Sequence, residues 1–297
     1  MEDIAIQLEG VSYRYPDGTL ALDGVNIRIL KGEKVAILGP NGAGKSTLVM
    51  HLNGILRATE GDVKVLGMPV EDATVREVRS RVGVVFQNPE DQLFCATLGE
   101  DVAFGPLSMG LPQDEVDERV RWALETVRLR GYEEKAPHHL SVGEMKRAAI
   151  ATVLAMKPEV LVLDEPTADL DQVSTRELVS FLTKLHQAER ITLILATHNV
   201  DLAPILADRA FIMSRGRVVG EGPIHEVLSN QLLVKEAGLE LPTMAQFFDK
   251  LRDRGLANSL PLTVDEAVEH FLAGFTSRTR RLETHHKRRS TASKKKR

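Results

Sequence analysis

The sequence predicts an α/β fold with a largely parallel core sheet, and three observations support this prediction. Apolar runs of strand length alternate with helical stretches as far as about residue 230, which is the pattern of strands joined by crossover helices. One apolar run leads into a glycine-rich loop and another ends in two adjacent acids, as is typical of the carboxyl edge of such a sheet. The 297 residues are 43% apolar and 27% charged, a composition that suits a packed core and excludes whole-chain disorder.

The strands are expected in the following order. Residues Ile4 to Leu8 alternate apolar and polar side chains, which predicts a half-buried antiparallel strand in an amino-terminal β subdomain. The core strands of the parallel sheet are expected at five apolar runs: Lys34 to Leu38, Val82 to Phe86, Val160 to Leu163, Ile191 to Ala196 and Ala210 to Ser214.

Helical patterns occupy about residues 88–157 and predict a helical subdomain. Asp114 to Arg128 places its apolar residues on one helix face. After about residue 240 the sequence becomes looser. A short helix is still expected from Val264 to Leu272, with Thr263 as its cap and Glu266 three residues later.

The charge is unevenly distributed along the chain. The net charge is −4, but residues 278–297 hold ten Lys or Arg and one Glu, so the remainder carries −13. An acidic body with a basic tail is not the footprint of a fold that coats nucleic acid, and we expect the tail to be disordered. No apolar run reaches the roughly 18–20 residues that cross a bilayer. The acidic first residues do not suit a secretory signal, and Cys95, the single cysteine, excludes an intrachain disulfide.

The strongest motif is GPNGAGKST, which fits the phosphate-loop pattern between an apolar strand and an amphipathic run. In this motif backbone N–H groups and a helix amino terminus surround phosphate oxygens. Lys45 is expected to bridge the outer phosphates and Ser46 to hold Mg²⁺. The predicted nucleotide contacts are Gly39, Pro40, Asn41, Gly42, Ala43, Gly44, Lys45, Ser46 and Thr47.

A second motif, LVLDEP, is an apolar strand that ends in Asp164 and Glu165. Acids at the carboxyl end of a buried parallel strand face the ligand crevice. Asp164 therefore suits the Mg²⁺ shell, and Glu165 suits a general base that accepts a proton from attacking water.

A third motif, LSVGE, is a capping box in which Ser141 is followed three residues later by Glu144. It predicts the start of a helix that is almost wholly apolar after Arg147 and therefore buried. The amino end of this helix offers N–H groups and a dipole to an anion. Taken alone, the motif is equally consistent with a well-capped core helix.

The series of motifs resembles the nucleotide-binding subunit of ABC transporters over about residues 4–230. The elements stand in the order of that family: Tyr15, the phosphate loop, Gln87, LSVGE, LVLDEP, ADLD at Ala168 to Asp171, and His198. The resemblance implies a P-loop ABC-type ATPase domain with a helical signature subdomain. It also implies that Tyr15 stacks on adenine, that Gln87 senses Mg²⁺ and water, and that His198 contacts the γ-phosphate.

In this family two subunits sandwich ATP, so the resemblance implies a second ATPase subunit, identical or related. Ser141 and Gly143, with Glu144 in the same motif, would then contact ATP held by the partner's phosphate loop. The implied catalytic residues are Glu165, His198, Gln87 and Lys45, and the implied Mg²⁺ ligands are Ser46, Gln87 and Asp164. Two departures are Val142, where Gly is usual, and Asp169, where a small residue is commoner.

A finer resemblance is to the ATPases of energy-coupling-factor importers of the cobalt and nickel type. It is carried by YRYPDGTLALDGVN, FQNPEDQLF and the stretch from His138 to Asp171. It implies that Glu90 to Phe94 meets a transmembrane coupling protein, that a separate membrane component captures the solute, and that the chain works at the cytoplasmic membrane face.

The expected organisation is an ATPase domain at 1–235, an extension of unknown role at 236–277 and a basic tail at 278–297. Two other functions stay open at this point. One is a soluble ABC-type ATPase acting on nucleic acid or the ribosome, although the 96 residues from Lys45 to Ser141 leave no room for the long coiled coil of DNA-repair members. The other is a regulatory subunit without turnover, suggested by Val142.

Overall fold

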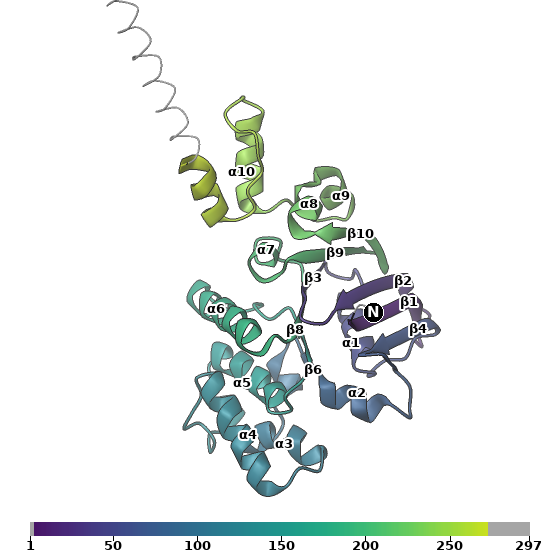
Figure 1. Ribbon diagram of the computed structural model, residues 1–297, viewed down its shortest axis with the longest axis vertical. Coiled ribbons are helices and arrows are strands. Elements are labelled where there is room, and N and C mark those ends of the chain that lie inside the picture. The colour runs from purple at the N-terminus through teal and green to yellow at the C-terminus, as the bar shows by residue number, and fades with distance from the viewer. Residues whose placement is uncertain (1–2, 273–297) are drawn as a thin grey trace, which may run out of the picture. The chain divides into compact units, whose positions relative to one another are not determined.

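The computed structural model describes residues 3–272 (Figure 1). The chain divides into two compact units, Met1–Glu240 and Leu241–Arg297. The boundary lies five residues beyond the one expected at 235. The basic tail expected at 278–297 falls outside the described residues.

The core of the first unit is a six-stranded sheet in the order β10-β9-β3-β8-β7-β6. The strands from β9 to β6 run parallel, and β10 pairs antiparallel with β9. All five predicted core strands are present, each within one residue of its expected bounds. The strands are β3 (Lys34–Leu38), β6 (Val82–Val85), β7 (Val160–Asp164), β8 (Thr192–Thr197), β9 (Arg209–Ser214) and β10 (Arg217–Pro223).

A second, antiparallel sheet in the order β2-β1-β4-β5 forms the expected amino-terminal β subdomain. Its first strand continues well past Leu8, because register shifts after Leu8 and Val11 let the pairing resume where the apolar alternation breaks. The strands are β1 (Ile4–Arg14), β2 (Leu20–Leu30), β4 (Glu60–Val65) and β5 (Met68–Pro69).

Helices lie around the parallel sheet, with α3, α4 and α5 packed together between residues 98 and 154. The helices of the first unit are α1 (Lys45–Leu52), α2 (Val75–Arg81), α3 (Leu98–Ser108), α4 (Gln113–Thr126), α5 (Val142–Leu154), α6 (Gln172–Glu189), α7 (Ala203–Leu206), α8 (Ile224–Ser229) and α9 (Gln231–Glu236), with 3₁₀ turns η1 (Pro89–Asp91) and η2 (Pro137–His139).

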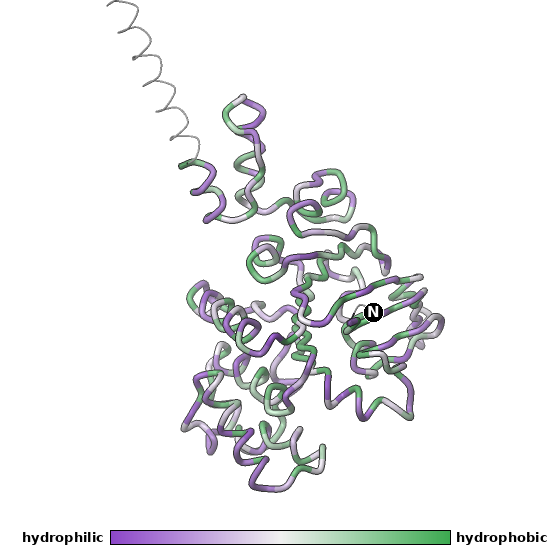
Figure 2. Tube along the Cα trace, in the orientation of Figure 1, coloured by the Kyte–Doolittle hydropathy of each residue, from purple (hydrophilic) through white to green (hydrophobic). Residues whose placement is uncertain are grey.

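Two apolar cores cover the two faces of the parallel sheet. Along β8, Leu193 and Leu195 join the core beneath the helices, while Ile194 and Ala196 join the core shared with the β subdomain. This alternation is what a strand buried on both faces requires. Figure 2 shows the hydrophobic residues concentrated along these central strands.

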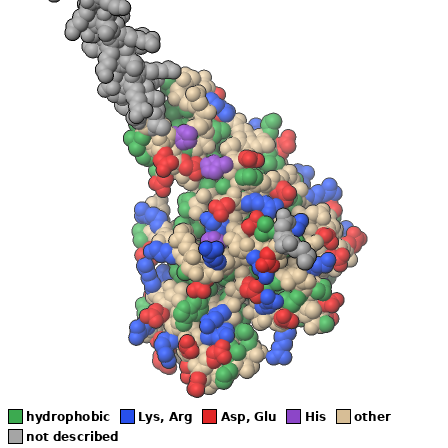
Figure 3. Space-filling view, viewed as in Figure 1, with side chains coloured by type: hydrophobic (Ala, Val, Ile, Leu, Met, Phe, Trp, Pro, Cys, Tyr) green, Lys and Arg blue, Asp and Glu red, His purple; other side chains and the backbone are tan. Residues whose placement is uncertain are grey.

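The second unit contains α10 (Thr243–Arg252) and a helical segment at 264–272. The expected cap is present, since the backbone N–H of Glu266 donates to Thr263 Oγ1 at 3.3 Å. Within residues 3–272, no helix is both long and apolar enough to cross a membrane. Lys and Arg side chains are interspersed with Asp and Glu on the face in Figure 3.

Candidate nucleotide-binding site

The candidate site forms where the parallel strands end. The pairing of Leu38 with Thr197 and of Asp164 with Ala196 fixes the carboxyl ends of β3, β8 and β7 beside one another. The next strand, β6, ends at Val85 opposite Leu163. The residues that follow these strands therefore meet at one edge of the sheet.

The phosphate loop connects β3 to α1 and depends on close backbone approach. Gly44 caps α1 with a φ of 101°, and a Cβ atom there would lie 2.6 Å from Ala21 O. A Cβ atom on Gly39 would lie 2.5 Å from Met213 O. Side chains at either position would displace the backbone, so the motif glycines are a packing requirement. Lys45 Nζ donates to Gly39 O at 2.8 Å and to Pro40 O at 3.2 Å.

Asp164 and Ser46 make a donor set that fits a hard divalent cation. Asp164 is 5% exposed, and its Oδ1 is buried with no hydrogen-bond partner among residues 3–272. Burial raises the pKa of this carboxyl, while a hydrogen bond with Ser46 lowers it, as do the charges of Lys45 and Lys146. Oxygen ligands of this kind are those that Mg²⁺ prefers.

Glu165 is held by three hydrogen bonds at the ends of β7 and β8. Its carboxylate accepts from Thr197 Oγ1 at 2.7 Å, from the His198 backbone N–H at 2.9 Å and from His198 Nδ1 at 2.7 Å. The Lys45 ammonium lies 3.5 Å away. The carboxylate is therefore fixed beside the phosphate loop, in a position suited to proton transfer.

Gln87 follows β6 and is exposed, and its backbone carbonyl accepts a hydrogen bond from Lys146 Nζ. Lys146 comes from α5 and is 2% exposed. Burial lowers the pKa of its ammonium, while Asp169, Asp164 and Glu165 raise it. A cavity of about 710 Å³ is lined by residues of all these segments, among them Ser46, Gln87, Val142, Lys146, Asp164 and Asp169.

Tyr15 lies beside the start of α1. Its hydroxyl is 3.1 Å from Thr47 Oγ1, and its ring packs edge-on against Tyr13 with centroids 5.0 Å apart. The structure thus places an aromatic ring next to the phosphate loop. Adenine stacking on this ring stays a prediction.

The LSVGE motif at Leu140 to Glu144, called the signature motif below, forms the capping box predicted from its sequence. Ser141 and Glu144 bond reciprocally at the start of α5, and Glu144 also accepts from Tyr132 Oη at 3.0 Å. The backbone and side chain of Ser141 lower the pKa of Glu144. Within residues 3–272, the hydrogen bonds of the Ser141 side chain are made with Glu144 and not with the phosphate loop of the same chain.

Two residues of the site were not predicted from the sequence. Thr197 binds Glu165, and the sequence feature that could have identified it is a hydroxyl residue at the end of a strand, just before His198. Lys146 binds the backbone of Gln87, and the sequence clue was a lysine near the start of a helix that is otherwise largely apolar and buried. Both became visible only when the strand register and the helix face were known.

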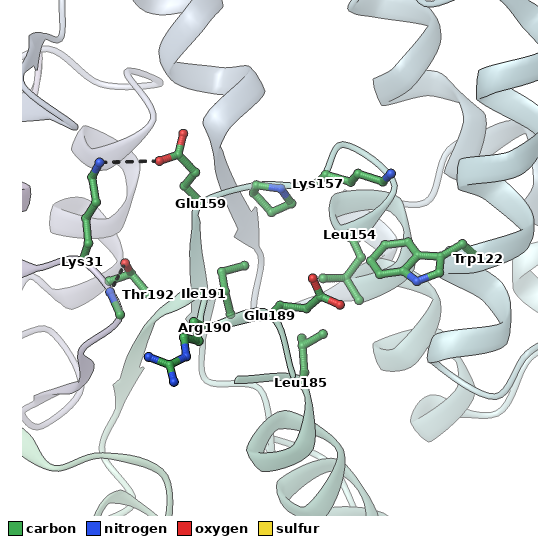
Figure 4. A pocket seen from close by; sticks show the side chains of 12 residues that line it. Lys31, Trp122, Leu154, Lys157, Glu159, Leu185, Glu189, Arg190, Ile191 and Thr192 are labelled. Atoms are coloured by element: carbon green, nitrogen blue, oxygen red, sulfur yellow. Dashed lines mark hydrogen bonds and ion pairs between the residues drawn. The ribbon is translucent and has the colours of Figure 1, made fainter. Parts of the chain in front are cut away.

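A second cavity, of about 490 Å³, lies at the opposite edge of the sheet (Figure 4). It opens beside the residues that precede β3, β7 and β8, and it is lined by Trp122 from α4 and Leu185 from α6. The Lys31–Glu159 ion pair, at 3.8 Å, closes one side. This cavity is separate from the phosphate loop. Among residues 3–272 no cluster of three or more His, Cys, Asp or Glu could hold a metal ion.

Comparison with known proteins places these features in a family. The ABC transporter family model matches residues 22–168. The energy-coupling factor transporter ATP-binding protein EcfA of Methanothermobacter thermautotrophicus is 47% identical over 90% of this chain and 86% of its own length. EcfA of Methanocaldococcus jannaschii is 49% identical over 84% of this chain and 90% of its own length.

Two solved structures are also similar. The first is cbiO1 from Clostridium perfringens, part of the ABC transporter complex cbiONQ. It is 40% identical with a TM-score of 0.71, covering 84% of this chain and 100% of that one. The second is a dimeric ATP-binding cassette in a post-hydrolysis state bound to ADP and Pi. It is 28% identical with a TM-score of 0.68, covering 74% of this chain and 98% of that one.

Proposed function

This chain belongs to the ATP-binding proteins of energy-coupling factor transporters within the ABC transporter family, and from that premise we propose how its residues drive import of a cobalt or nickel ion. As a member, it binds ATP and hydrolyses it to power transport. The observation that carries the mechanism is the fixed position of Glu165 between Lys45, Thr197 and His198.

Glu165 is the general base in this proposal. Its carboxylate accepts a proton from the attacking water, while His198, hydrogen-bonded to it at 2.7 Å, orients that carboxylate and contacts the γ-phosphate. Lys45 takes up charge on the outer phosphates. Mg²⁺, when bound, would neutralise charge that develops on the phosphate oxygens, and Ser46, Asp164 and Gln87 are the residues that would hold it.

The site is completed by a second ATPase subunit. Ser141 is exposed and bonded within its own capping box, so its anion-binding helix end is available to a nucleotide held by another chain. The similar cassette that is described as dimeric with ADP and Pi supports this arrangement. Closing of the dimer on ATP, and opening after hydrolysis, would supply the movement.

The transmembrane coupling protein is proposed to dock beside Glu90 to Phe94. Phe94 is 65% exposed and Phe104 is 53% exposed, and their rings meet edge-on with centroids 5.1 Å apart. Asp101 Oδ1 fixes this segment by accepting from the backbone N–H groups of Phe94 and Cys95 at 3.0 and 2.9 Å. An exposed, rigid aromatic pair is typical of an interface anchor.

The cobalt or nickel cargo is supported by the motifs that resemble ATPases of that importer type and by the similarity to cbiO1 of the cbiONQ complex. In this proposal the ion passes through partner proteins and not through this subunit.

Glu165→Gln tests the hydrolytic site. Glutamine keeps the shape and can still accept from Thr197, but it is too weak a base to take the water's proton. We expect phosphate release to fall about 100-fold or more, with ATP-bound dimers accumulating in size-exclusion chromatography. Glu177→Gln, an exposed acid on α6, serves as the control. Turnover at the parent rate in Glu165→Gln would contradict the assignment of the base.

A further inference from the structure

Two side chains fasten the segment that follows β6 onto helix α5. Lys146 Nζ donates to the backbone carbonyl of Gln87. Gln92 uses its whole amide: its Nε2 donates to Ala149 O and to Thr152 Oγ1, each at 2.8 Å, and its Oε1 accepts from the Phe86 backbone N–H at 3.2 Å. Both ends of the segment are therefore bound to the same helix.

Of the two attachments, the one made by Lys146 is the stronger indication of a functional role. An ammonium that is 2% exposed is costly to bury unless its donors are satisfied. A neutral side chain of similar length would fill the same volume at lower cost. Lys146 instead donates to the backbone carbonyl of Gln87, and it lines the same cavity as Ser46 and Asp164.

The position of Lys146 on α5 matters as much as its contact. It lies four residues after Val142, on the same helix face. The helix begins at the signature motif, whose Ser141 and Gly143 serve the nucleotide of the second subunit in the proposed dimer. A rigid helix thus carries, about one turn apart, a group that faces the partner and a group that holds Gln87 of its own site.

We propose that Lys146 is a positioning residue that joins the segment containing Gln87 to helix α5. As a result, Gln87 of one nucleotide site and the LSVGE motif that contacts the other site would move together as one rigid body. This inference rests on the dimeric mechanism proposed above. Gln92 reinforces the attachment at the far end of the segment.

The test separates positioning from folding. In Lys146→Met the side chain keeps a similar length but loses its N–H donor. The change removes the cost of burying the ammonium but also its attraction to Asp169, Asp164 and Glu165, and we expect these opposing effects to leave the Tm close to the parent value. In a Glu165→Gln background, which removes hydrolysis, ATP-driven dimerisation measured by analytical ultracentrifugation is expected to weaken by about 10-fold. The ATP affinity of the protomer, measured at a concentration too low for dimerisation, is expected to stay within about threefold of the parent value. In the single variant Lys146→Met, which keeps Glu165, we expect kcat for ATP hydrolysis to fall by a larger factor than KM changes.

Lys146→Gln keeps an N–H donor and is expected to recover part of the lost dimerisation. Lys184→Met, an exposed lysine on α6, is the matched control and should behave as the parent. If Lys146→Met dimerises and hydrolyses as the parent does, the inference is overturned. A loss of dimerisation that tracks a lower Tm in both Lys146 variants would also overturn it, because the role would then be structural. If the parent itself neither dimerises on ATP nor hydrolyses it, the proposed function fails instead.

Discussion

Glu165 adopts a left-handed backbone conformation, with a φ of 44°, which costs a residue with a side chain on the order of 1–3 kcal/mol. The turn that it makes after β7 brings the carboxylate back against Thr197 and His198, at the end of the neighbouring strand. Three hydrogen bonds to the carboxylate compensate for this strain. The geometry of the base is therefore set by β8 as much as by its own strand.

His51 is a buried residue behind the phosphate loop whose titration should be visible in stability. It is fully buried on α1, its ring contacts Tyr13, and its Nδ1 lies 2.7 Å from Thr47 O. Burial is the main cause that lowers its pKa below the ordinary value of 6.5. The unfolded chain then binds a proton more readily than the folded one, so stability is retained above pH 6.5 and declines as pH falls below it.

The comparison of parent and His51→Gln measures this effect. Glutamine can still donate to Thr47 O but does not titrate. We expect the Tm of the parent to fall more steeply than that of the variant between pH 7.5 and 5 in differential scanning calorimetry, other titrating groups being common to both. Parallel pH profiles would show that His51 does not contribute.

At the scale of elements, two helices begin with the same capping motif, but only one of these motifs is proposed to contact a nucleotide. Thr97 with Glu100 caps α3, and Ser141 with Glu144 caps α5, both as complete capping boxes. Replacing either hydroxyl residue by Ala should lower the free energy of unfolding by about 1 kcal/mol. Only Ser141→Ala should also weaken ATP-driven dimerisation and phosphate release, because only that helix end is proposed to meet a nucleotide. Equal losses of activity in both variants would assign Ser141 to folding alone.

The same elements show what could be read from the sequence. The capping box of α5 and the apolar core strands are local patterns, so they were predicted almost to the residue. The full length of β1 was not, because its pairing resumes after bulges that only the partner strands define. Thr197 and Lys146 were missed for the same reason, since each acts on a residue that strand pairing or helix packing brings near from more than 30 positions away.

At the scale of the whole first unit, the candidate nucleotide site and the proposed docking surface lie in different places. The carboxyl ends of its parallel strands hold the phosphate loop and both acids, while the exposed aromatic pair lies on α3 and the turn before it. The segment from Phe86 to Cys95 joins the two, since it begins at the Gln87 carbonyl held by Lys146 and ends at the backbone held by Asp101. The proposed coupling partner would therefore act on the site through this segment.

This connection predicts separable effects on transport and on hydrolysis. Phe94→Ala removes the more exposed ring without touching the phosphate loop, Asp164 or Glu165. We expect the isolated subunit to hydrolyse ATP at the parent rate. In vesicles that contain the whole transporter, ATP-driven uptake of cobalt or nickel should fall about 10-fold or more, because aromatic anchors contribute 2 kcal/mol or more to an interface. Val219→Ala, which trims a 46% exposed side chain on β10, is the control. Full uptake by Phe94→Ala would show that the docking surface lies elsewhere. If the parent takes up another solute and neither cobalt nor nickel, the proposed cargo is refuted, while the proposed coupling is not.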